Sequence, residues 1–231
     1  MNKDNIIFTE LVDIDEAELA DINQLIIDTW AYQEWNKQEN VLPMADFFLE
    51  TILLTSTKVF VAKDKGKIIG VVAAALTPDL FPKSRIRYRQ LEALSLIINQ
   101  GKPETVFDFY LETMKLNEEL IQQSKETFDA ALNLLILNEN YKGLGLGSKL
   151  YQFFLDYLKE NKAKTFFLLT DSYSNYPFYE KKGLKRIAAQ RFSWSKDAEV
   201  SEEDVEEYYV YAGEWVDSFT NITSEIIAST H

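Results

Sequence analysis

Cysteine is absent from this chain of 231 residues, and histidine occurs once, as the last residue. The chain therefore forms no disulfide and offers neither a thiolate nucleophile nor a cysteine-ligated metal. A lone His231 also leaves no serine–histidine–aspartate triad and no zinc site built from histidines, so we expect no metal centre. The lack of cysteine is typical of proteins that work in the reducing cytoplasm, which is the location we expect.

Long apolar runs are also missing. No stretch approaches the roughly 18 uninterrupted apolar residues of a membrane-spanning helix, and the opening MNKDNIIFTELVDIDEAE lacks the apolar centre of a signal peptide. Basic residues are outnumbered, with 24 Lys and Arg against 37 Asp and Glu and a net charge of -13. We therefore expect no membrane and no nucleic acid among the partners, while the acidic surface weakly favours a cationic substrate.

What is present suits one large core, because 46% of the residues are hydrophobic and 15 Phe and 12 Tyr contribute bulk. We expect a single domain over residues 1–231 that ends in a tail at 216–231. Hydrophobic patterns predict strands at residues 6–12, 58–62, 67–76, 128–137, 165–170, 186–195 and 207–215. They predict helices over 16–34, 43–54 and 146–161, and two more, 88–100 and 104–123, inside an insertion at 77–127. The sequence thus predicts the α/β (α+β) class, with a helical insertion between the third and fourth strands.

The most informative stretch is 132–158, where an apolar strand leads through a polar turn into a glycine-rich loop and an amphipathic helix. The glycines at 143, 145 and 147 alternate and open directly into the helix. Amides of a first helical turn lack partners within the helix, and glycine lets an anion approach the backbone. We interpret the loop as a phosphate cradle rather than a simple chain reversal.

Two familiar phosphate loops do not match this spacing. A Walker loop ends in Gly-Lys-Ser/Thr, whereas Ser148 precedes Lys149 here. A dinucleotide fingerprint has the spacing Gly-x-Gly-x-x-Gly, whereas this chain has Gly-x-Gly-x-Gly. A nucleotide-dependent enzyme is therefore not favoured.

The loop instead resembles the acetyl-CoA-binding motif of the GNAT superfamily of N-acetyltransferases, Arg/Gln-x-x-Gly-x-Gly/Ala, at Lys142, Gly145 and Gly147. Lys142 departs from the family pattern, since it keeps the positive charge but lacks the planar fork of arginine. A second resemblance is Phe-Tyr-Glu-Lys-Lys-Gly-Leu at 178–184, close to the family's Phe-Tyr-Glu-Lys-x-Gly-Phe. The resemblance implies a mixed, mostly antiparallel sheet of about six to seven strands flanked by helices.

The resemblance also implies which residues would hold acetyl-CoA as cosubstrate. The backbone of the central strand would pair with the pantetheine arm, the loop would hold the pyrophosphate, and an asparagine would contact the cofactor. These residues are Leu135, Ile136, Leu137, Lys142, Gly143, Leu144, Gly145, Leu146, Gly147, Ser148 and Asn175. The family asparagine falls at Ser172 here, so either Asn175 takes over its role or the contact is lost.

By the same resemblance Tyr179 is the expected general acid, with a packing aromatic as the alternative. The general base is open among Glu139, Asp171 and residues of the first helices. The resulting hypothesis is an acetyl-CoA-dependent N-acetyltransferase acting by direct transfer on a primary amine of a small molecule or protein. The alternative is a non-catalytic acyl-CoA-binding regulatory module. A homodimer is compatible with either. A basic patch, Lys83, Arg85, Arg87 and Arg89, suggests a role in binding CoA phosphate or a partner subunit as readily as solvated charge.

Overall fold

The computed structural model describes residues 5–35, 37–77, 84–99, 103–193 and 205–215, and every structural statement below concerns them. The predicted tail at 216–231 and most of the acidic segment at 201–207 lie outside these ranges. The strands are β1 Ile6–Glu10, β2 Lys58–Asp64, β3 Lys67–Leu76, β4 Ala130–Leu137, β5 Thr165–Asp171, β6 Lys185–Ser193 and β7 Val205–Glu214. The helices are α1 Glu16–Thr29, α2 Tyr32–Trp35, α3 Gln38–Thr55, α4 Ser84–Asn99, α5 Pro103–Ser124, α6 Leu146–Glu160 and α7 Pro177–Lys181.

The strands form one seven-stranded sheet in the order β1-β2-β3-β4-β5-β7-β6. All neighbours are antiparallel except β4 and β5, which run parallel because α6 connects them. Helices α4 and α5 lie between the third and fourth strands. The predicted mixed, mostly antiparallel sheet with a helical insertion at this point is therefore confirmed.

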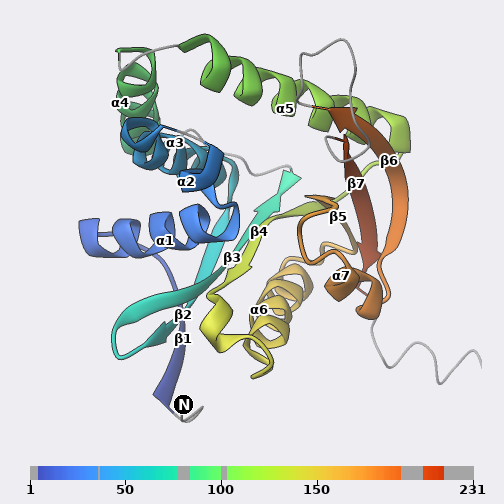
Figure 1. Cartoon of the computed structure of the whole chain (residues 1–231). Coiled ribbons are helices and arrows are strands. Elements are labelled where there is room, and N and C mark those ends of the chain that lie inside the picture. The colour runs from blue at the N-terminus through green and yellow to red at the C-terminus, as the bar shows by residue number, and fades with distance from the viewer. Residues whose placement is uncertain (1–4, 36, 78–83, 100–102, 194–204, 216–231) are drawn as a thin grey trace, which may run out of the picture.

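Helices cover both faces of the sheet (Figure 1). On one face α1, α3 and α4 pack against β2, β3 and β4 around buried residues such as Ile22, Leu49 and Val71. On the same side α5 places Leu116 and Leu120 against Val210 of β7. On the other face α6 and α7 pack against a second cluster, which includes Leu150, Phe154, Phe166, Leu168 and Tyr211. Among the described helices, none has the length and apolar character needed to span a bilayer.

Local chemistry explains several boundaries. Asp15 and Glu18 form a reciprocal capping box at the start of α1. The helix predicted over 16–34 is interrupted at Ala31, whose φ of 48° is left-handed, so α1 and α2 are separate. The predicted hairpin is confirmed, and its turn residues Lys65 and Gly66 both have positive φ, as a type I′ turn requires.

Several predicted boundaries were wrong, and two of them lie in elements of the core. The helix expected over 43–54 begins at Gln38, so Pro43 lies inside α3 rather than in its first turn. The proline is buried, and packing against the neighbouring helices offsets the backbone hydrogen bond that it cannot donate. The central strand starts at Ala130 instead of residue 128.

Strand β4 contains a bulge at Asn133. Its neighbours Leu132 and Leu134 pair with consecutive residues, Ala74 and Ala73, so Asn133 is the extra residue. The Asn133 amide Nδ2 donates to the Thr55 carbonyl oxygen at 2.9 Å, which ties the bulge to the end of α3. The bulge puts Leu132 on the α6 face and Leu134 on the α1 face. Simple alternation along this strand would have put Leu132 and Leu134 on one face, and the bulge makes that interpretation of the sequence wrong.

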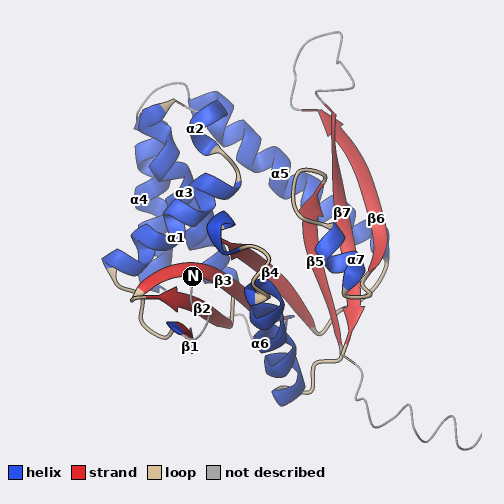
Figure 2. Ribbon diagram, turned by 60° about the horizontal axis from the view of Figure 1, so that its bottom comes forward, coloured by secondary structure: helices blue, strands red, loops and turns tan. Residues whose placement is uncertain are grey.

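The sheet separates into two parts at its centre. β4 and β5 pair over only two residue pairs, Ala130 with Phe166 and Ala131 with Phe167. Beyond that junction β4 continues alongside β3, and β5 continues alongside β7. Figures 1 and 2 show the parts β1–β4 and β5–β7 diverging from this junction. Past the junction, the backbone edges of β4 and β5 that face one another are not paired with each other.

Candidate active site

The glycine loop leads from the end of β4 into α6, as predicted. Gly143 and Gly145 both have a φ of 79°, a conformation that strains other residues, and Gly145 is the N-cap of α6. Below the loop, Leu144 is partly buried and Leu146 is buried, so their side chains anchor it to the core. Ser148 is exposed on the first turn. The Tyr141 hydroxyl donates to Asp64 Oδ2 at 2.7 Å and fixes the short 3-10 helix Glu139–Tyr141 before the loop to β2.

No contact within the described part of the protein requires glycine at position 147. It lies in the first turn of α6, and a Cβ atom placed on it would meet no atom within 4 Å. By contrast, a Cβ on Gly70 would come within 2.9 Å of the Leu137 side chain, so that glycine is required by packing. Open space above a bare helical backbone is what a phosphate needs in order to reach the amides. The loop therefore leaves the backbone of the first turn of α6 open to an anion.

Lys142 already has a partner within the protein. Its Nζ lies 2.6 Å from Glu139 Oε1, and both side chains are exposed. The hydrogen bond and the charge of Lys142 lower the pKa of the Glu139 carboxyl. A lowered pKa makes Glu139 a weaker base, and the ion pair competes with any phosphate for Lys142.

Past the junction, two of the three predicted residues of β4 direct their backbone groups away from β3. Asn138 donates its amide to the Ile69 oxygen of β3 at 2.8 Å. Backbone groups alternate between the two edges of a strand, so those of Ile136 also face β3, whereas those of Leu135 and Leu137 face the β5 side. No strand pairing with β5 is described at these two residues. Their amides and carbonyls are thus directed at the space between the two parts of the sheet.

Tyr179 lies on α7, which follows β5. Its ring is half-buried and contacts those of Phe178 and Tyr211, with centroids 5.4 and 6.2 Å away. Burial, and then the negative charge of Asp171, raise the pKa of the Tyr179 phenol well above 10. Among the described residues no hydrogen-bond partner is found for the Tyr179 hydroxyl. A protonated phenol with a free hydroxyl is suited to donate a proton to a ligand atom.

The turn between β5 and α7 is ordered by Asp171 and Ser172. Asp171 Oδ1 accepts the amides of Tyr173 and Ser174 at 3.0 and 2.7 Å. Ser172 Oγ accepts the Glu207 amide at 3.1 Å, so this hydroxyl serves to join the end of β5 to β7. Asn175 is exposed just before α7. Of the two candidates for the family asparagine, Asn175 therefore has the freer side chain.

These features coincide with a sequence match over most of the chain. Residues 22–184 match the profile of the acetyltransferase (GNAT) family. The chain belongs to this family. No curated protein matches it by sequence.

Solved structures support the GNAT fold. A protein from Pyrococcus horikoshii OT3 superimposes with a TM-score of 0.56 at 16% identity, over 90% of this chain and 98% of the other. An N-acetyltransferase from Staphylococcus aureus Mu50 gives a TM-score of 0.51 at 11% identity, over 92% of this chain and 99% of the other. At such low identity the likeness establishes the fold alone.

In this GNAT domain two cavities lie on the face opposite α6. The first, of about 190 Å³, lies at the end of β4 and is lined by Leu25, Asp28, Thr29, Leu137, Asn138, Glu139 and Asn140. The second, of about 330 Å³, lies between α3 and α4 and is lined by Asp46, Glu50, Arg89, Ala93, Ser95 and Leu96. Of these two cavities, the first adjoins the predicted strand residues.

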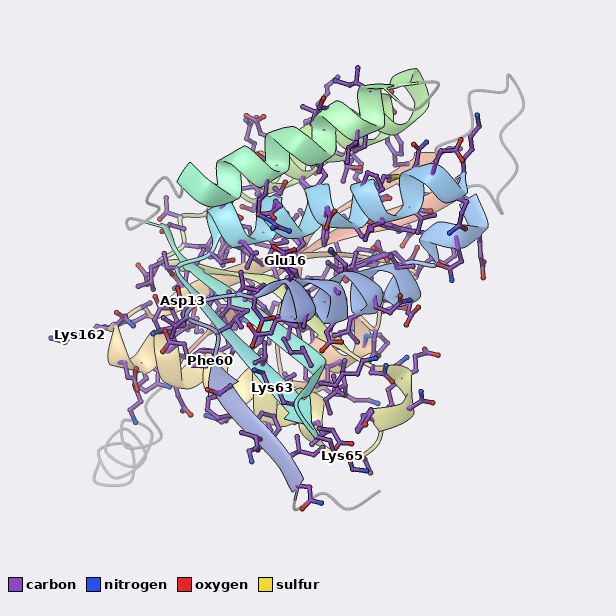
Figure 3. The ribbon with its side chains drawn as sticks, turned by 90° about the vertical axis from the view of Figure 1, so that its left-hand side faces the viewer. Asp13, Glu16, Phe60, Lys63, Lys65 and Lys162 are labelled. Atoms are coloured by element: carbon purple, nitrogen blue, oxygen red, sulfur yellow. The ribbon has the colours of Figure 1, made fainter. Side chains whose placement is uncertain are left out.

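Arg89 of the predicted basic patch is turned toward carboxylates. Its guanidinium contacts Glu50 at 2.7 Å and Glu16 at 2.9 Å, which joins α4 to α3 and α1. Glu16, labelled in Figure 3, lies at the start of α1 beside these helices. Lys83 lies outside the described residues, as do the side chains of Arg85 and Arg87. Arg89 therefore links helices on the face away from the glycine loop.

Three residues near Tyr179 were missed by the sequence analysis. Glu180, Arg186 and Tyr211 are joined to one another by hydrogen bonds beside α7. Glu180 lies in the motif at 178–184, where the sequence analysis gave it no role, and no local motif marks Arg186 or Tyr211, which are 25 residues apart and meet through the pairing of β6 with β7. A useful signal was the excess of tyrosine in β7, where residues 208, 209 and 211 are all tyrosine.

Proposed function

We propose that the protein is an acetyl-CoA-dependent N-acetyltransferase that transfers the acetyl group directly to a primary amine of a small molecule or protein. The proposal rests on one arrangement above all. The glycine loop and the β4 edge border the opening where β4 and β5 diverge, and α7, which carries Tyr179, follows β5. Within a GNAT domain, these are the parts that the reaction needs.

When bound, acetyl-CoA supplies an activated acetyl group and a thiolate leaving group. The first-turn amides of α6 and its helix dipole would bind the pyrophosphate. Backbone groups of Leu135 and Leu137 would hold the pantetheine arm, as another strand would be held. Ile136 has its backbone groups committed to β3 and would contribute by fixing the strand.

Tyr179 would donate the proton that the departing sulfur needs. The phenol is protonated at neutral pH, which is the state required of an acid. The cavity at the end of β4 would admit the acceptor, and the carboxylates of Asp28 and Glu139 favour a cationic amine there. The lowered pKa of the Glu139 carboxyl makes Glu139 a weaker base for activating that amine.

Turnover tests this proposal directly. The protein is incubated with acetyl-CoA and a panel of polyamines, amino sugars, amino acids and peptide amines, and free thiol is measured. We expect thiol release that depends on one class of amine. CoA binding without release from any amine would instead favour the acyl-CoA-binding regulatory module.

A further inference from the structure

The helix that carries Tyr179 is too short to hold its own position. α7 comprises five residues, and isolated helices of this length are unstable in water. None of its residues is fully buried. The direction of the Tyr179 hydroxyl must therefore be set by contacts between α7 and its surroundings.

One of these contacts is a closed set of hydrogen bonds. Arg186 Nη2 donates to Glu180 Oε1 at 3.0 Å, and the Tyr211 hydroxyl donates to the same oxygen at 2.7 Å. The Tyr211 oxygen in turn accepts from Arg186 Nε at 3.0 Å and Nη2 at 2.8 Å. Tyr211 is fully buried, so it is a rigid support for the other two. Glu180 directly follows Tyr179, so this set of bonds fixes the residue next to the phenol.

Arg186 also reaches the residue before α7. Its guanidinium carbon lies 3.8 Å from the centre of the Tyr209 ring and 5.2 Å from that of Tyr176. The Tyr176 and Tyr209 rings contact each other edge to face, with centroids 5.4 Å apart. Tyr176 is the N-cap of α7, so Arg186 contacts both ends of the short helix.

We propose that Arg186 is a positioning residue, which holds α7 through Glu180, Tyr211 and Tyr176 so that the Tyr179 hydroxyl faces the space between β4 and β5. This inference rests on the proposed function and extends it to a residue of β6. Its physical basis is that small displacements of an acid from its target cost large factors in rate. A planar fork that donates and stacks at once is specific to arginine, so lysine replaces it poorly.

The test compares Arg186→Met, Arg186→Lys and Tyr179→Phe, with kcat and KM measured for each. We expect Arg186→Met to lower kcat about 10- to 100-fold while KM for acetyl-CoA changes less than about twofold. Arg186→Lys should recover part of the loss. In a Tyr179→Phe background, Arg186→Met should have almost no further effect, because the group that it positions is gone.

Lys58→Met is the matched control. Lys58 forms an ion pair with Glu10 at 2.7 Å, with side-chain exposures of 27% and 40%, against 33% and 47% for the Arg186–Glu180 pair. It also lies 5.8 Å from the centre of an aromatic ring, that of Tyr157. A loss of Tm in both variants with a loss of kcat only in Arg186→Met supports the proposal. The proposal would be overturned if Arg186→Met lowered kcat by the same factor in the unmodified protein and in the Tyr179→Phe background.

A second readout is independent of turnover. Tyrosine labelled with ¹³C at Cζ reports the titration of each phenol by NMR, and Tyr179→Phe identifies the Tyr179 signal. Release of α7 should expose the phenol to water, so its titration in Arg186→Met and in Glu180→Gln should move toward the ordinary value of about 10. If the Tyr179 phenol titrates in both variants as it does in the unmodified protein, Arg186 does not position it. If the unmodified protein releases no thiol, the proposed function fails, and this titration still decides whether Arg186 positions Tyr179.

Discussion

The two elements on either side of the β4–β5 opening are held in different ways. The glycine loop is fixed by backbone conformation and by α6, a 15-residue helix with a buried apolar side. α7 has five residues and depends on side chains from β6 and β7. The loop would bind a part of the ligand that does not react, whereas α7 carries the proposed acid. Side-chain contacts hold the element that requires the more exact placement.

The largest expected effect comes from Tyr179→Phe on the α7 side. The change keeps the ring packing and removes the hydroxyl, so kcat and kcat/KM should fall together by about 10²- to 10⁴-fold. Acetyl-CoA affinity measured by calorimetry should stay nearly constant. A nearly neutral rate would indicate a packing tyrosine, and a raised KM with intact kcat would indicate a hydroxyl that holds the cofactor.

Gly147→Leu tests the loop side of the comparison. A leucine side chain would fill the open space above the first turn and block the backbone, so CoA affinity should fall more than about tenfold. Stability should rise by about 0.5–1 kcal/mol, because leucine is a far better helix former than glycine.

Gln152→Leu, which adds the same side chain to an exposed position one turn further along α6, is the control for Gly147→Leu. It should leave CoA affinity unchanged. Unaltered calorimetric affinity in Gly147→Leu itself would remove the loop from the binding site.

Alkaline pH should weaken the α7 side more than the loop side, since α7 is held by contacts to the phenols of Tyr209 and Tyr211, whereas the loop side uses the phenol of Tyr141. Burial, then the hydrogen bond to Glu207, raise the pKa of Tyr209 to about 12. A raised pKa means that the folded protein keeps a proton that the unfolded chain loses near pH 10. Stability should therefore be complete below pH 10 and fall as the pH rises toward 12, by several degrees in Tm.

Urea unfolding at several pH values measures this loss. The fall between pH 10 and 12 should be shallower for Tyr209→Phe than for the unmodified protein. An equal slope in the two proteins would show that Tyr209 does not carry the alkaline sensitivity.

The smallest effect is expected for Glu139→Gln, at the entrance to the loop. The change releases Lys142 from its ion pair, so CoA affinity should increase by less than about fivefold. Tm should not change, because the pair is exposed to solvent. Lys142→Gln should weaken CoA binding instead, and stronger binding in that variant would show that the lysine does not meet the phosphates.

Much of the fold was predictable because its signals are local. The glycine loop between strand and helix, and the Lys65–Gly66 hairpin, are set by turn chemistry and periodicity within a few residues. The bulge at Asn133 was not predictable, because Leu132 and Leu134 look alike in sequence and their faces are set by pairing with β3. The same bulge and pairing decide that Leu135 and Leu137, but not Ile136, direct their backbone groups at the opening.

The site was predictable only where a motif marks it. Tyr179 and the glycines lie in contiguous motifs, whereas Arg186 acquires its partners through the pairing of β6 with β7. The hydrogen bond of Ser172 to Glu207 also depends on where β7 lies. Contacts between distant segments decide these features, and a single sequence does not record them.

The inserted helix α5 limits how far the two parts of the sheet can move apart. A junction of two residue pairs would by itself act as a hinge between the two parts of the sheet. α5 starts beside α4, which packs on α3, and reaches β6 and β7 at the far side (Figure 1). Its 22 residues make a rod of about 33 Å. Because α5 contacts α4 at one end and β6 and β7 at the other, it joins the two parts of the sheet a second time. The length of this helix therefore sets how far apart the two parts lie.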